Sequence, residues 1–267
     1  CVTRRQRQMC IRDRFNIMRS SHISYRTSNP ALNINTFKRV SSSSPFTLDQ
    51  KMTIKGTVDK TAVCLILLLI PAYYVFTTGM VGYAIPGAII GFILAMVTIF
   101  KRKWAQYTVP AYSVAQGFFL GGISYYYNES YEGIVLQSIS LTIFILFSLL
   151  FAYRSKIIRP DENFKLGLFA ATGGIFLLYI VDLIMSIFGT GISFLDVNNS
   201  SNFSIGVSLF IVVIASLNLV IDFDFIEEGS EKGAPKFMEW YGAFGLLVTL
   251  IWLYLEILRM LAKMKNR

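Results

Sequence analysis

The sequence predicts an all-α membrane protein with seven transmembrane helices. Between Thr61 and Leu261 the chain carries seven apolar stretches. Each has about 20 residues, the length that a helix needs to cross the hydrocarbon core of a bilayer. Charged residues make up 15% of the chain and hydrophobic residues 54%, whereas a soluble domain has roughly 25% charged residues. The mean hydropathy of +0.54 agrees with burial in lipid. Because lipid offers backbone groups no hydrogen-bond partners, these stretches are expected to be helices.

Each stretch is expected to form one span. The first contains Pro71, which predicts a kink. Gly87 and Gly91 in the second span lie one helical turn apart, as do Gly117 and Gly121 in the third. Small residues at this spacing let helix backbones approach closely, so we interpret all four as packing residues. The seventh stretch is less uniformly apolar than the others. The expected spans are 61–78, 81–100, 108–127, 133–153, 166–188, 205–226 and 238–263.

Lysines and arginines in the connections predict the orientation. Lys101–Lys103 lie between the second and third spans, and four more basic residues lie between the fourth and fifth, from Arg154 to Lys165. The connections after the first, third and fifth spans contain none. Because basic loops stay in the cytoplasm, the N-terminus is expected there. Seven spans then place the basic tail, residues 259–267, outside. The seventh segment is therefore either re-entrant or a full span, and we favour the full span.

The chain is expected to have three parts. Residues 1–17 are basic and aperiodic, and we expect them to be a non-native leader that precedes a natural start at Met18. Residues 18–58 read as a cytoplasmic, mostly disordered arm, and residues 59–267 as the transmembrane domain. The net charge of +9 does not indicate nucleic-acid binding, because the basic residues lie in short loops and tails.

Several kinds of chemistry are excluded or disfavoured by the residues present. The single histidine, His22, lies in the arm, and the three cysteines form no CxxC motif. A histidine-based metal or catalytic cluster is therefore excluded, and no cofactor is predicted. HExxH, GxSxG and Walker motifs are missing from the sequence, so an enzyme is not expected. An intramembrane aspartyl protease that uses Asp182 and Glu256 stays as an alternative.

Ionisable groups at membrane depth are the candidate functional residues, because they are costly there unless they are paired or hydrated. Asp182 lies in the outer half of the fifth span, Asp222 and Asp224 lie near the inner end of the sixth, and Glu256 lies in the seventh. Asp222 and Asp224 are about 200° apart around a helix, so they cannot face the same partner. Glu256 has Arg259 three residues on, where the two can pair.

The connection after the sixth span is acidic. Four glutamates, ending with Glu239, lie between residues 227 and 239, with only Lys232 and Lys236 among them. An acidic mouth at the cytoplasmic side would concentrate cations. The alternative interpretation is a solvated loop with no further purpose.

Four stretches carry a family resemblance. IDFDFIEEG, starting at Ile221, is followed by MEWYGAFGLLVTLIWLYLEILRMLAK. This C-terminal third resembles the Bax inhibitor (transmembrane BAX inhibitor motif, YccA-like) family. GFFLGGIS in the third span and SNPALNINTF in the arm look like its bacterial branch. The resemblance covers about Asn29 to the end. It implies a seven-helix fold whose last helix is surrounded by the other six, in a bacterial plasma membrane.

The resemblance also implies a function, a pH-sensitive calcium leak channel. In this family an Asp near the end of helix six and an Asp in helix seven share a proton, because two adjacent carboxylates resist ionising together. Asp222 occupies the first position, whereas the second falls near Thr249, which is no carboxylate. The substitute is expected to be either Glu239, across the hairpin from Asp222, or Glu256. YccA-like members imply an alternative: a non-channel regulator that binds a membrane-bound quality-control protease or another stress-response partner, with the cytoplasmic arm required.

Overall fold

The computed structural model describes residues 51–158 and 160–267. The expected leader and most of the expected arm therefore lie outside the described residues. Within them the chain forms seven long helices and no β-strand, with one isolated bridge between Lys51 and Pro235. Three short 3-10 helices are η2 (Val81–Tyr83), η3 (Arg102–Trp104) and η4 (Ser193–Leu195). The long helices are α3 (Ile54–Thr78), α4 (Ala84–Phe100), α5 (Ala105–Ser130), α6 (Ile134–Arg154), α7 (Glu162–Ile187), α8 (Asn202–Glu231) and α9 (Met238–Lys265).

Local sequence signals set several helix ends. The Thr53 hydroxyl accepts a hydrogen bond from the Gly56 amide at the start of α3, and Asp161 and Ser201 cap α7 and α8 in the same way. Such side chains satisfy amides that have no partner within the helix. Gly79 ends α3 with a positive φ of 66°, a conformation that glycine adopts without strain. Because α3 begins at Ile54, residues 54–58 of the expected arm belong to this helix.

All seven expected spans are helical, and six of them are long and apolar enough to cross a membrane. The exception is α5, which has 26 residues but lower hydropathy. Several of its polar side chains face neighbouring helices. The Thr108 hydroxyl lies 2.7 Å from that of Thr98 on α4, and the Ser124 hydroxyl lies 2.7 Å from that of Tyr254 on α9. The expectation of seven apolar spans is therefore confirmed for six, and α5 is a buried helix of mixed composition.

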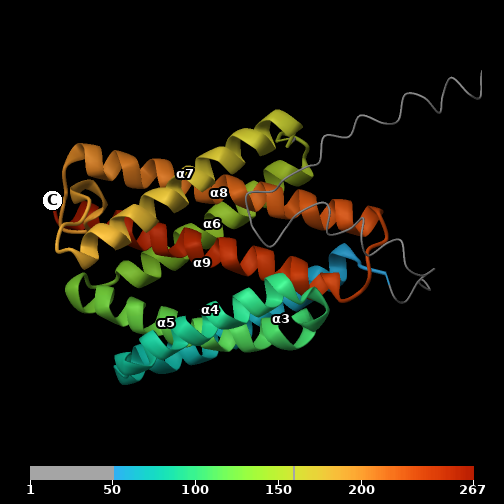
Figure 1. Cartoon of the computed structure of the whole chain (residues 1–267), viewed down its shortest axis with the longest axis horizontal. Helices are drawn as coiled ribbons and strands as arrows, with labels where there is room; N and C mark the ends of the chain where they lie inside the picture. The colour runs from blue at the N-terminus through green and yellow to red at the C-terminus, as the bar shows by residue number, and fades with distance from the viewer. Residues whose placement is uncertain (1–50, 159) are drawn as a thin grey trace, which may run out of the picture.

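The helices form one bundle in which α3, α4 and α5 pack together and α9 contacts α3, α5, α6 and α8 (Figure 1). α8 and α9 are the most buried of the six apolar helices. α9 is one continuous helix of 28 residues, or about 42 Å at 1.5 Å per residue. It therefore has the length of a full span. The start of α3 and the C-terminus lie at opposite ends of the bundle (Figure 1).

The bundle has two ends, a predicted cytoplasmic end and a far end. The predicted cytoplasmic end holds the α4–α5, α6–α7 and α8–α9 connections and the start of α3. The far end holds the α3–α4, α5–α6 and α7–α8 connections and the C-terminus.

The four paired glycines of α4 and α5 face neighbouring helices at short range. A Cβ at Gly87 of α4 would lie 2.7 Å from the Ala115 carbonyl oxygen of α5. A Cβ at Gly121 of α5 would lie 2.6 Å from the Ala72 carbonyl oxygen of α3. A Cβ at Gly117 would meet the backbone and Pro71 of α3, whereas a Cβ at Gly91 would meet only the end of the flexible Gln116 side chain. A side chain at these positions would strike the neighbouring helix. Glycine therefore allows α3, α4 and α5 to pack closely together.

Candidate functional site

The two aspartates of α8 have different surroundings, in agreement with their angular separation. Asp222 is 1% exposed, in the interior of the bundle. Asp224 is partly exposed and forms an ion pair with Lys165 of α7. Lys165 was expected in the connection before α7, but it lies in the first turn of the helix and is largely buried. Lys165 had been counted among the loop charges that set the orientation, so its place beside Asp224 was not expected.

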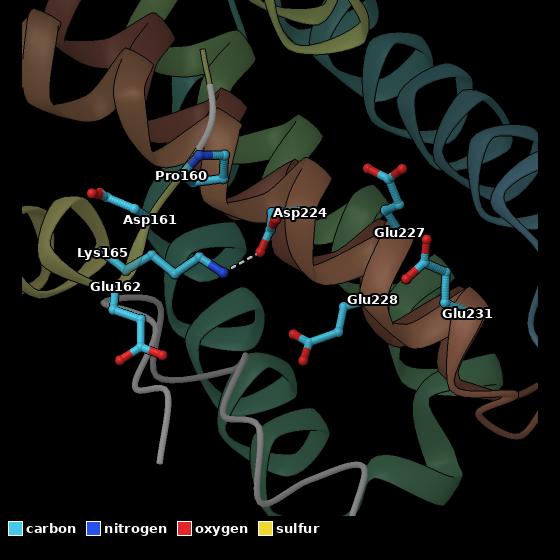
Figure 2. Close-up of a pocket in the computed structure, with 8 residues that line it drawn as sticks. All are labelled: Pro160, Asp161, Glu162, Lys165, Asp224, Glu227, Glu228 and Glu231. Atoms are coloured by element: carbon cyan, nitrogen blue, oxygen red, sulfur yellow. Dashed lines mark hydrogen bonds and ion pairs between the residues drawn. The ribbon is translucent and has the colours of Figure 1, made fainter. Parts of the chain in front are cut away.

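An acidic pocket lies beside this ion pair at the predicted cytoplasmic end (Figure 2). It has a volume of about 410 Å³. Its lining holds six carboxylates and one ammonium group. Figure 2 shows the Lys165 side chain pointing toward Asp224. The residues that line the acidic pocket are Pro160, Asp161, Glu162, Lys165, Asp224, Glu227, Glu228 and Glu231.

The acidic pocket is richer in negative charge than the connection after α8 alone. Glu227, Glu228 and Glu231 were expected to form an acidic mouth, and they lie in the last turns of α8. The start of α7 adds Asp161 and Glu162 across from them. Glu227 also accepts a hydrogen bond from the Tyr153 hydroxyl of α6. Like charges in one concave site raise the local concentration of cations.

Glu239 does not line the acidic pocket. It is buried between the start of α9 and the start of α3. It is 2% exposed and forms an ion pair with Lys60 of α3. Its Oε1 accepts hydrogen bonds from the Thr53 amide at 2.9 Å and the Thr53 hydroxyl at 3.0 Å. The carboxylate lies directly over Gly56, where a Cβ would overlap it. One buried carboxylate therefore joins the start of α3 to the start of α9.

Met52 strengthens this junction. Its amide donates a hydrogen bond of 2.6 Å to the Ala234 carbonyl in the α8–α9 connection, and its side chain is buried. The last residues before α3 are thus fixed to the connection that joins the two most buried apolar helices.

The Gly56→Ala substitution is expected to destabilise this junction. The added Cβ would displace the Glu239 carboxylate and leave Lys60 without its partner. We expect a loss of about 1–3 kcal/mol, as for other overpacked sites, measured by thermal unfolding in detergent. Gly82→Ala is the control, because a Cβ there meets open space. Equal unfolding midpoints for the two variants would show that the carboxylate can shift at no cost.

Glu256 lies in a third polar cluster, toward the far end. It is 3% exposed. Its Oε1 accepts hydrogen bonds from the Tyr179 hydroxyl of α7 at 2.6 Å and the Trp252 indole at 3.2 Å. The Arg259 guanidinium pairs with its Oε2 at 3.5 Å and donates to the Tyr179 hydroxyl at 2.8 Å. Pairing with Arg259 was expected from the sequence, whereas Tyr179 and Trp252 were not.

The two remaining candidates have local partners. Asp182 is half-buried, and its Oδ1 accepts a 2.8 Å hydrogen bond from the Ile192 amide in the α7–α8 connection. Thr249 is buried, and its hydroxyl donates to the Gly245 carbonyl of its own helix at 3.2 Å. Across residues 51–158 and 160–267, no three His, Cys, Asp or Glu side chains are grouped closely enough to hold a metal ion.

Comparison with known proteins places the chain in a family. The family model described as Bax inhibitor 1 like matches residues 17–266, which is nearly the whole sequence. A comparison with curated proteins gave no match. The six apolar helices fit an integral membrane protein. Because the family model covers far more than half of the sequence, this chain belongs to the Bax inhibitor 1-like family.

Proposed function

We propose that this protein is a pH-sensitive cation conduit, a calcium leak channel of a bacterial plasma membrane with its N-terminus in the cytoplasm. The proposal rests above all on one observation. A carboxylate that is 1% exposed, Asp222, lies two residues from Asp224, which lines a pocket with five further carboxylates. Carboxylates at an entrance and a buried acid on the same helix are features that a cation pathway can use.

The acidic pocket would act as the entrance. Its six carboxylates face one ammonium group, Lys165, so its net charge is strongly negative when all are ionised. A concave site of one sign with low-dielectric walls focuses the field and draws cations from solution. Lys165 already pairs with Asp224, which supports a role for this carboxylate in binding positive charge.

The gate would be built on the carboxylates near this end of α8 and α9. Thr249 offers no second aspartate, so like-charge repulsion between two adjacent carboxylates is not available at that position. We assign the gating to Asp222, with Glu239 as the carboxylate of α9. Because Glu239 is bonded to Thr53 and Lys60, a change at α9 would be coupled to the start of α3. In this proposal α9 is the central helix, which its contacts with α3, α5, α6 and α8 support.

Asp222→Asn tests the proposal. A carboxylate 4 Å from a cation contributes about 4 kcal/mol at an effective dielectric constant of 20. Losing even a third of that lowers a rate about tenfold. We expect calcium flux into proteoliposomes to fall at least that far and to lose its dependence on pH. Asp59→Asn is the control, because Asp59 is an exposed carboxylate of α3. Unchanged flux in Asp222→Asn would refute the proposal.

The alternative, a regulator of a membrane protease, predicts a different result. The wild-type protein would then carry no calcium, and capture of the partner would depend on the arm before Lys51. Its supporting observation is that Met52 and Thr53 connect the end of this arm to α8 and α9. Co-purification with intact and arm-deleted protein separates the two functions, since equal capture by both would oppose an arm-mediated contact.

A further inference from the structure

The connection between α7 and α8, residues 188–201, is folded against the far end of the bundle. We call it the strap. Ile192 donates its amide to Asp182 of α7, and the Asn199 side-chain amide donates to the Ser193 carbonyl and hydroxyl at 3.0 Å each. Leu195 is buried in a cluster with Ile175 and Ile211. The strap is therefore an ordered part of the bundle.

Lys263, in the last turn of α9, is hydrogen-bonded to the strap. Its ammonium group donates a 2.8 Å hydrogen bond to the Phe194 carbonyl of the strap. The same carbonyl accepts a 2.8 Å hydrogen bond from the Ser204 hydroxyl at the start of α8. Asn266 adds a 3.2 Å hydrogen bond from its side-chain amide to the Val197 carbonyl. The end of α9 is thus bonded to two points along the strap.

The burial of Lys263 makes this contact unusual. Its exposed fraction is 0%, and an ammonium group is costly to remove from water. A lysine at the end of a helix ordinarily extends its flexible side chain to the surface. Some compensation is present: Lys263 lies at the C-terminus of α9, where a cation is favoured, and Asp196 of the strap and Glu256 are nearby opposite charges. Arg259, a like charge, opposes it.

We infer that Lys263 is the latch that closes the far end of the bundle, by holding the strap over α9 and by placing a buried positive charge where a cation would leave. The attachment of the strap to α9 follows from the contacts, whereas the closure of a cation exit rests on the proposed function. Release of the ammonium group from the Phe194 carbonyl would loosen the strap on α9 and move the charge away from the exit. A fixed positive charge of this kind is a barrier to cations in other pores.

Lys263→Met tests this inference, because methionine keeps much of the side-chain length and removes the charge. We expect the amides of the strap, including Ile192 and Leu195, to exchange with deuterium about tenfold faster, the change that follows when a hydrogen bond to a charged group is lost. In proteoliposomes the calcium leak is expected to rise. Lys265→Met is the control, since Lys265 is exposed and bonds to the Glu132 carbonyl in a different connection.

Asn266→Ala is a milder second variant. It removes the bond to Val197 without disturbing a buried charge, and it is expected to speed exchange of the strap to a smaller extent. Strap exchange in both Lys263→Met and Asn266→Ala that matches the wild type would overturn the inference.

The two readouts separate the inference from the proposed function. Faster strap exchange in a protein that carries no calcium at all would support the latch and count against the conduit. A conducting wild-type protein whose leak does not change when the strap is freed would overturn the inference and leave the conduit standing.

Discussion

Gly117→Val is expected to cause the largest loss of stability among single substitutions in the α3–α5 interface. A Cβ at Gly117 would overlap the Leu68 carbonyl oxygen and lie 2.5 Å from Cγ of Pro71. Neither atom belongs to a flexible side chain, so α3 and α5 must separate to make room. We expect a loss of about 3 kcal/mol, toward the upper end of the range for overpacked cores.

The measurement is the midpoint of thermal unfolding in detergent, followed by tryptophan fluorescence. Gly167→Val on α7 is the matched control, because a Cβ at that glycine meets open space. It introduces the same side chain into an apolar helix without a clash. If Gly117→Val unfolded at the same temperature as Gly167→Val, the close approach of α3 and α5 would be refuted.

Glu256→Leu is expected to have the second large effect. Leucine fills a similar volume but leaves the Tyr179 hydroxyl, the Trp252 indole and the Arg259 guanidinium without their common acceptor. Removing one partner of a buried ion pair typically costs 3–5 kcal/mol, because the other charge stays uncompensated. Arg259 is partly exposed and can regain some water, so we expect a loss of about 3 kcal/mol.

A double-mutant cycle with Tyr179→Phe measures how much of this loss passes through the hydroxyl, since contacting residues deviate from additivity. Glu228→Leu is the control for stability, because its ion pair with Lys232 is exposed and such pairs contribute under about 1 kcal/mol. Equal losses for Glu256→Leu and Glu228→Leu would argue that the Glu256 cluster does not hold α7 to α9.

The helices could be predicted from the apolar stretches, because a helix of about 20 residues has the length needed to cross the hydrocarbon core of a bilayer. The difficulty arose at α5, where Thr108, Ser113 and Ser124 are buried polar residues. The hydropathy of one segment carries no information on which helices pack against it. The hydrogen-bond partners of α5 on α4 and α9 could therefore not be predicted from the sequence. The helix was expected correctly, but its apolar character was not.

The candidate residues were found from their charge, whereas their partners on other helices were not; Arg259, on the same helix as Glu256, was the partner that the sequence indicated. The angle between Asp222 and Asp224 follows from helix geometry within one segment. Lys165 lies 59 positions before Asp224 in the chain, Tyr179 lies 77 before Glu256, and Thr53 lies 186 before Glu239. Periodicity gives the face of a helix and says nothing about which helix packs there.

The basic tail is an instructive case. Basic residues in loops and tails favour the cytoplasmic side of a membrane. Counted in this way, the charges of the tail disagree with a C-terminus outside the cytoplasm. In the structure the charged groups of Lys263 and Lys265 donate to the carbonyls of Phe194 and Glu132 at the far end, and the neutral Asn266 amide donates to that of Val197. Side chains that donate hydrogen bonds to backbone carbonyls cap the connections, and this role cannot be recognised from the amino-acid composition.

The mixed character of α5 has a consequence for how the chain is made. A segment with too little hydropathy leaves the translocon poorly as a lone helix. Its polar face is covered partly by α3 and α4, which the ribosome synthesises just before it, and partly by α9, which is synthesised after α8. We therefore expect α5 to enter the bilayer together with α3 and α4, and its insertion to become secure only when α9 has emerged from the ribosome.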